Sequence, residues 1–107
     1  MEKFAKAFLS KPLRGARDKK WALAGVVGSG NLEVLFERGA CAPDKMECEV
    51  ETSIPGYKES WVAALADFAG NYSVGGTKVT IHDQGAAPIL VTLRLRQAYD
   101  HLVKSAK

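Results

Sequence analysis

The stretch MECEVE, residues 46–51, contains the clearest strand signal in the chain. Its apolar residues alternate strictly with glutamates, and successive side chains of a β-strand point to opposite faces of the sheet. This pattern therefore places one face of the strand on a core and the other in solvent. We interpret Glu47, Glu49 and Glu51 as a solvated face, with docking to a basic partner as the lesser alternative.

The segments on both sides of this strand complete a mixed pattern of strands and helices. Residues 21–27 and 32–37 are short apolar stretches on either side of the turn-forming GSGN at 28–31, which predicts a hairpin. Residues 57–70 carry apolar side chains at helical intervals and end on glycine and asparagine, which predicts a helix. Residues 78–82 alternate again and are expected to return to the sheet.

The C-terminal segment fits either a strand or a helix at first sight. Val91, Leu93 and Leu95 alternate with polar residues, but apolar residues continue at helical intervals as far as Leu102, and Pro88 suits a first helical turn. The length of this stripe favours a helix. We therefore predict the α+β class: a small antiparallel sheet of about four strands, in the order β-β-β-α-β-α, with two helices packed on one face.

The predicted core joins the inward-facing residues of the strands to the apolar stripes of the two helices. From the sheet it comprises Val26, Val34, Met46, Val50, Val79 and Ile81, and from the helices Trp61, Leu65 and Leu95.

Composition indicates a small folded domain with an uneven distribution of charge. The 107 residues are 47% hydrophobic and carry a net charge of +3. Residues 1–20 hold seven Lys or Arg against two acidic residues, so we interpret them as a basic N-terminal arm and residues 21–107 as the folded domain. We expect residues 1–15 to be dispensable for folding. A basic arm can bind nucleic acid, but no motif of that kind accompanies it, and a solvated or partner-docking tail is preferred.

Compartment and cysteine usage point to an ordinary intracellular protein. No apolar run is long enough to span a membrane and the first residues lack a secretory signal, so we expect a cytoplasmic location without membrane insertion. Cys41 and Cys48 are interpreted as free thiols, because two cysteines make no disulfide framework and neither has the spacing of a zinc site.

The tripeptide Gly28-Ser29-Gly30 is the main candidate for chemistry. It lacks the lysine and spacing of a phosphate-binding loop, and its glycines adjoin the serine instead of standing two positions away as in a hydrolase elbow. On composition alone it is a turn. Two adjacent glycines also remove bulk around the Ser29 hydroxyl, which would let the active site of another protein close over it.

The two histidines suggest no catalytic machinery. His82 and Asp83 end a predicted strand, whereas His101 lies on the polar face of the last helix, so no triad can be assembled. We expect an exposed histidine and a turn-forming or helix-capping aspartate. No catalytic residue and no metal site are predicted.

Two stretches carry a resemblance to a known family. LAGVVGSGNLEVL, residues 23–35, resembles the modification loop of malonate decarboxylase acyl carrier proteins. IHDQGAAP at 81–88, followed by LRLRQA at 93–98, resembles the other recurrent segment of that family, and Thr52-Ser53 and Trp61 fall between the two as expected. The similarity covers about residues 21–105.

The resemblance implies a function for the serine between the two glycines. In that family it carries 2'-(5''-phosphoribosyl)-3'-dephospho-CoA through a phosphodiester, and the terminal thiol of this arm holds acetyl or malonyl. Carried over by position, Ser29 is the covalent attachment site, and Gly28 and Gly30 give access to the loop. The implied partners are an acyl transferase (alpha) subunit, decarboxylase (beta and gamma) subunits and the enzyme that attaches the arm. The chain itself would be a non-catalytic carrier.

Two positions depart from the family pattern, and two alternatives stay open. Asn31 stands where an aspartate is usual, and Gln84 stands where a phenylalanine is common. The chain is also similar to the citrate lyase carrier subunit, which bears a related arm but typically lacks the Val-Gly-Ser-Gly run. A small basic nucleic-acid-binding module is the weaker alternative, from a different class.

Overall fold

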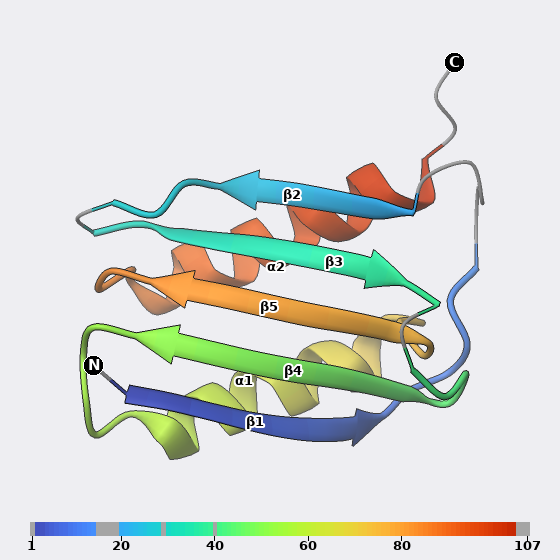
Figure 1. The fold of residues 1–107 in the computed structure, drawn as a ribbon, viewed down its shortest axis with the longest axis horizontal. Coiled ribbons are helices and arrows are strands. Elements are labelled where there is room, and N and C mark those ends of the chain that lie inside the picture. The colour runs from blue at the N-terminus through green and yellow to red at the C-terminus, as the bar shows by residue number, and fades with distance from the viewer. Residues whose placement is uncertain (1, 15–19, 29, 40, 105–107) are drawn as a thin grey trace.

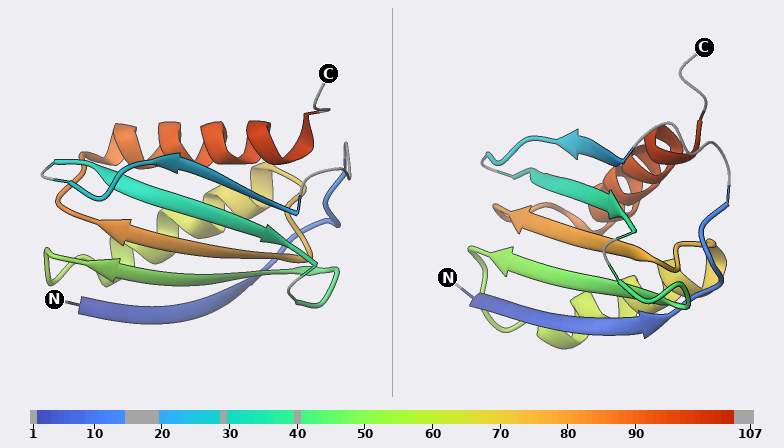
Figure 2. Two further views of the ribbon diagram at one scale, coloured as in Figure 1. Left: turned by 45° about the horizontal axis from the view of Figure 1, so that its top comes forward. Right: turned by 45° about the vertical axis from the view of Figure 1, so that its right-hand side comes forward.

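The fold, taken from a computed structural model, is described for residues 2–14, 20–28, 30–39 and 41–104. Its elements in chain order are β1 (Glu2–Leu9), β2 (Trp21–Gly25), β3 (Leu32–Arg38), β4 (Lys45–Thr52), α1 (Lys58–Asn71), β5 (Thr77–Asp83) and α2 (Pro88–Val103). The five strands form one sheet in the order β1-β4-β5-β3-β2. Both helices cover the same face of this sheet (Figures 1 and 2). The predicted α+β class and the one-sided packing of the helices are confirmed.

The sheet is mixed, whereas a purely antiparallel one of about four strands was expected. β4 and β5 are parallel neighbours, and the other pairs are antiparallel. Parallel neighbours need a crossover connection, which α1 supplies between β4 and β5. The additional strand is β1, at the edge beside β4.

This edge strand comes from the basic N-terminal segment. β1 pairs with β4 along its whole length, from Glu2 opposite Thr52 to Leu9 opposite Lys45. Phe8 and Leu13 are buried in the core. The described part of the segment that we interpreted as an arm is therefore an edge strand and its continuation, packed on the core, while the expectation that residues 1–15 are dispensable for folding stays a prediction. Exposed lysines are a usual feature of edge strands, because they discourage pairing with other sheets, and here they resembled a charged arm.

The glutamates of β4 lie on the sheet face that the helices leave uncovered. Glu47 is exposed, and Glu49 and Glu51 are half-buried. Lys3 of β1 forms an ion pair with Glu49, with Nζ and Oε1 3.4 Å apart. The predicted solvated face is confirmed, and one of its carboxylates has a basic partner within the chain itself.

Eight of the nine residues predicted for the core are buried. The exception is Val26, which is 62% exposed because β2 ends at Gly25, one residue earlier. Gly25 has φ +80°, and a Cβ there would lie 2.1 Å from the carbonyl oxygen of Leu32. Only glycine fits this close approach. The strand therefore ends at Gly25, whereas the sequence pattern predicted that it continues to Val27.

The C-terminal segment is a helix, as its length predicted. Val91, Leu95, Ala98 and Leu102 form its buried stripe, and Leu93 is 47% exposed. α2 packs on β2 and β3, whereas α1 packs beside β1. No helix in the described part of the chain is both long enough and apolar enough to cross a membrane.

Candidate functional site

The Gly28-Ser29-Gly30 tripeptide connects β2 to β3 at one end of the sheet (Figure 1). Ser29 itself lies outside the described residues, so its predicted role as the attachment point stays a prediction. The backbone N–H of Asn31 donates to the carbonyl oxygen of Gly28 at 2.9 Å. Gly30 has φ +70°, a conformation that other residues rarely adopt. The predicted turn is therefore present, and Gly30 is required by its backbone geometry.

The space around the two glycines is open. A Cβ built at Gly28 or at Gly30 would meet no heavy atom within 4 Å. Gly28, unlike Gly30, does not have the positive φ that favours glycine. Nothing within the described part of the chain therefore requires a glycine at position 28, and its lack of a side chain instead leaves room for an approaching molecule.

The turn is clamped to the connection between β5 and α2. The N–H of Gly30 donates to the carbonyl of Gln84 at 2.7 Å, and the N–H of Gln84 donates to the carbonyl of Asn31 at 2.9 Å. The two positions that depart from the family pattern, Asn31 and Gln84, are thus bonded to each other. Because both bonds use backbone atoms, a change of side chain at either position leaves this clamp intact.

The side chain of Asn31 connects the turn to α2. Its Oδ1 accepts a hydrogen bond from the N–H of Leu32 at 2.8 Å and lies 3.4 Å from Nε of Arg94. Nη1 of Arg94 donates to Oε1 of Gln97 at 2.8 Å, which holds the guanidinium in place. A half-buried cation therefore lies beside the turn. Sequence reasoning gave Arg94 no role of its own, although it belongs to the LRLRQA stretch.

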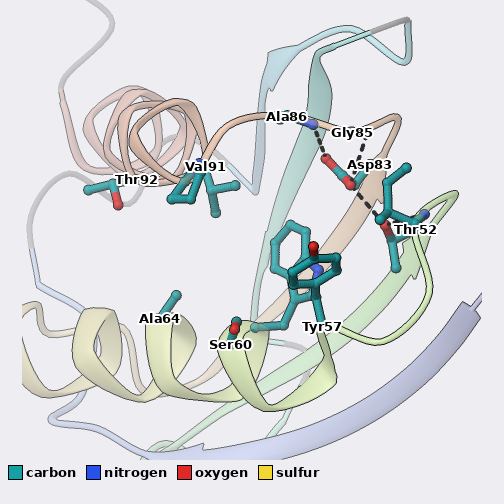
Figure 3. A pocket seen from close by; sticks show the side chains of 12 residues that line it. Thr52, Tyr57, Ser60, Ala64, Asp83, Gly85, Ala86, Val91 and Thr92 are labelled. Carbon is teal, nitrogen blue, oxygen red and sulfur yellow. Dashed lines mark hydrogen bonds between the residues drawn. The ribbon is translucent and has the colours of Figure 1, made fainter.

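Asp83 organises the turn that follows β5. It is 5% exposed and accepts hydrogen bonds from the Thr52 hydroxyl at 2.8 Å and from the N–H groups of Gly85 and Ala86 at 3.1 and 2.9 Å (Figure 3). The predicted turn-forming role is confirmed. All of these bonds are structural, and they tie the end of β4 to the start of the α2 connection.

The two histidines lie in different elements, His82 in β5 and His101 in α2. His82 is half-buried, with Nδ1 3.9 Å from Oε1 of Glu33. α2 begins close after β5 and runs towards the other end of the sheet (Figure 2). His101 lies in the last turn of α2 and is exposed. Within residues 2–14, 20–28, 30–39 and 41–104, no group of three His, Cys, Asp or Glu side chains could hold a metal ion.

Cys41 and Cys48 are free cysteines, as expected, and Cys48 is buried. Burial raises the pKa of the Cys48 thiol to about 12. The pKa of Cys41 is also raised, chiefly by burial. The thiolate is the reactive form of cysteine, so both shifts disfavour reaction at neutral pH.

A pocket of about 400 Å³ opens between the N-terminal halves of the two helices, at the same end of the sheet as the turn. Figure 3 shows α1, with Ser60 and Ala64, facing Val91 and Thr92 of α2 across this space. No sequence motif indicated this pocket, because its walls come from segments far apart in the chain. The lining residues are Thr52, Ile54, Tyr57, Ser60, Trp61, Ala64, Asp83, Gly85, Ala86, Pro88, Val91 and Thr92.

Comparison with known proteins identifies the family of this chain. A family model described as malonate decarboxylase delta subunit (MdcD) matches residues 19–102. The malonate decarboxylase acyl carrier protein of Xanthomonas campestris pv. campestris is 49% identical over 81 residues, which cover 76% of each chain. The protein of the same name from Acinetobacter calcoaceticus is 43% identical over 98 residues, or 92% of this chain and 93% of the relative.

A solved structure shares the fold. A chain in the crystal structure of a Pseudomonas malonate decarboxylase hetero-tetramer in complex with malonate superposes with a TM-score of 0.80 at 36% identity. The match covers 95% of this chain and 99% of that one, so most of the basic N-terminal segment is included in it. The chain therefore belongs to the malonate decarboxylase delta subunit family of acyl carrier proteins.

Proposed function

We propose that this chain is the acyl carrier subunit of a cytoplasmic malonate decarboxylase, and that Ser29 carries the CoA-derived arm through a phosphodiester. The family match over residues 19–102, which spans the turn and the clamp on it, is the observation that carries this proposal. The arm is 2'-(5''-phosphoribosyl)-3'-dephospho-CoA, as the resemblance of the loop implies. When attached, it supplies a terminal thiol that holds acetyl or malonyl as a thioester.

The residues around the turn fit such a group. Open space surrounds Gly28 and Gly30, so an attaching enzyme can close over the loop and a bulky substituent can leave it. The Arg94 guanidinium beside Asn31 is a cation of the kind that binds phosphate oxygens. The clamp between Gly30, Asn31 and Gln84 holds the turn in one place, which fixes the point from which the arm extends.

The chain itself contributes position and not catalysis. An acyl transferase (alpha) subunit would exchange the acetyl for malonyl on the carrier, and the beta and gamma subunits would decarboxylate the bound malonyl. A tethered thioester reaches successive active sites at a high effective concentration, without diffusing away. The carrier needs an accessible attachment residue on a rigid support, and both the open space at Gly28 and Gly30 and the bonds from the turn to Gln84 support this role.

Ser29→Ala tests this function directly. Wild type, Ser29→Ala and the control Ser53→Ala are each coexpressed with the attaching enzyme, their intact masses are compared, and malonate-dependent release of carbon dioxide is assayed in the assembled complex. We expect the mass addition and the activity in wild type and Ser53→Ala, and neither in Ser29→Ala. An equal mass addition on Ser29→Ala would place the arm elsewhere, and full activity of that variant would refute the carrier function.

The nucleic-acid alternative loses part of the segment on which it depended. It required a free basic arm, whereas residues 2–9 form β1 and Lys3 is paired with Glu49. Nucleic-acid binding would weaken steeply as salt increases and would leave the mass of the chain unchanged. Measurements of salt dependence and intact mass therefore separate the two functions.

A further inference from the structure

We propose that the pocket between α1 and α2 receives the thiol end of the arm when it carries acetyl, and shelters that thioester from solvent. This inference rests on the proposed function, because it needs the arm on Ser29. It assigns a second role to the carrier. Besides presenting the acyl group to the other subunits, the chain would bind and protect the acetyl thioester but not the malonyl thioester.

The pocket is adjacent to the turn from which the arm would extend. Gln84 is bonded through its backbone to both Gly30 and Asn31. Its two neighbours along the chain, Asp83 and Gly85, line the pocket. The lining of the pocket therefore begins on either side of a residue that is bonded to the turn, and a long arm attached beside Gly30 can fold back into the pocket.

The size and lining of the pocket suit the end of such an arm. Its volume of about 400 Å³ lies within the range of about 300–1,000 Å³ that is usual for small-molecule sites. Trp61, Ala64 and Val91 supply apolar walls for the methylene and methyl groups of a pantetheine-like chain. The hydroxyl groups of Ser60 and Thr92 are available to hydrogen-bond its amides (Figure 3).

One wall of the pocket is fixed by bonds that need no ligand. Asp83 lines the pocket and accepts hydrogen bonds from Thr52, Gly85 and Ala86, which hold this wall in place. Ile54 and Tyr57 line the pocket and remain 42% and 56% exposed. Exposed apolar side chains grouped around a cavity are a common feature of ligand-binding grooves.

The charge of the lining distinguishes the two acyl groups. None of the twelve lining residues is Lys, Arg or His, and the charged group among them is the Asp83 carboxylate. Acetyl is neutral and can enter such a space, whereas malonyl would bring a free carboxylate into an apolar site next to another negative charge. We therefore expect the acetyl form to occupy the pocket and the malonyl form to stay outside, available to the decarboxylase.

The test uses the full chain with the arm attached, verified by intact mass and loaded in turn with acetyl and malonyl. NMR spectra record the Trp61 indole N–H and the Val91 methyl groups in each form. Ala64→Phe fills the pocket from α1, and Ala63→Phe is the matched control, because Ala63 is exposed and does not line the pocket. The rate of hydrolysis of the acetyl thioester is measured in all three proteins.

We expect acetyl loading to shift the Trp61 and Val91 signals in wild type and Ala63→Phe but not in Ala64→Phe, and malonyl loading to shift them less. Hydrolysis should be several-fold slower in wild type than in Ala64→Phe. If the acetyl form gives the same signals as the chain with the unloaded arm, the inference fails while the proposed function stands, because the mass already verifies the arm. Equal shifts with malonyl would overturn the charge selectivity. If Ala64→Phe does not fold, Ala64→Met replaces it.

Discussion

The two ends of the sheet differ in how their connecting segments are bonded. At the tied end, residues 10–13, 41–45 and 72–77 join to one another. The Ser10 hydroxyl lies 2.8 Å from the carbonyl of Ala69 and accepts a hydrogen bond from the N–H of Val74. The backbone N–H of Gly75 donates to the carbonyl oxygen of Lys11, and the carbonyl oxygen of Gly75 accepts from the N–H of Leu13. A Cβ at Gly75 would lie 2.2 Å from the carbonyl oxygen of Pro43, so this end has no spare room.

The open end comprises residues 25–28, 30–31, 53–57 and 84–88. It contains the clamped turn, the pocket and the start of both helices (Figure 1). A side chain at Gly28 would meet nothing, whereas one at Gly75 would collide with three carbonyl oxygens. The contrast indicates that one end is closely packed and that the other end leaves space around its turn. Such a division is usual where a rigid scaffold presents a functional loop.

Truncation of one buried leucine should give the largest difference between the two ends. Leu13 at the tied end is 7% exposed, and Leu13→Ala should lower the free energy of unfolding by about 2–5 kcal/mol. Val27 at the open end is 50% exposed, and Val27→Ala should change it by no more than about 0.5 kcal/mol. Urea denaturation of both variants measures this, with Leu65→Ala as the reference for a fully buried leucine. If Leu13→Ala and Val27→Ala lower the free energy of unfolding equally, the packing of the N-terminal segment on the core is contradicted.

The same substitution, glycine to alanine, compares how much space the two ends of the sheet leave for an added methyl group. Gly75→Ala should cost about 1–3 kcal/mol, because Pro43, Ser10 and the backbone around them would have to move. Gly28→Ala should stay within about 0.5 kcal/mol, since its Cβ meets open space. Thermal denaturation gives both values. Slower attachment of the arm to Gly28→Ala, at unchanged stability, would show that this glycine serves the approaching enzyme; a large loss of stability would contradict the open geometry.

The buried thiol of Cys48 should make the free energy of unfolding depend on pH in the alkaline range. Burial raises the pKa of Cys48 from 9.0 to about 12, so the folded chain keeps a proton that the unfolded chain loses above pH 9. The free energy of unfolding should then fall as pH rises from 9 towards 12, by at most about 1.4 kcal/mol per pH unit. Cys48→Ala should flatten this slope relative to wild type in denaturation at several pH values. Parallel pH profiles would indicate that the thiol is not shielded.

Ser29→Ala should have the smallest effect on stability. A surface substitution away from special structural features changes the free energy of unfolding by no more than about 0.5 kcal/mol. The hydrogen bonds that the structure describes at this turn join backbone atoms of Gly28, Gly30, Asn31 and Gln84, and the substitution leaves these atoms in place. Calorimetry of wild type and variant, both without the arm, measures the difference. A loss of several kcal/mol would mean that the serine also has a structural role.

Local patterns in the sequence determined the elements after residue 20, most of the core and the family. The alternation of MECEVE assigns the faces of β4, and helical spacing identifies α1 and α2, because these periods depend only on neighbouring residues. The glycine-flanked serine and its surroundings were enough to recognise the acyl carrier family. Val26 was misplaced because the end of β2 depends on the approach of Leu32, which strand periodicity does not express.

Only the tertiary structure decided which segments lie together. The Lys-rich stretch at residues 2–9 resembles a solvated arm until β4 is placed beside it, and the parallel pairing of β4 with β5 follows from the crossover through α1. Arg94 reaches Asn31 across 63 positions of the chain, and the walls of the pocket come from both helices and from the connections after β4 and β5. Such contacts depend on how whole elements pack, and no periodicity within a single segment encodes them.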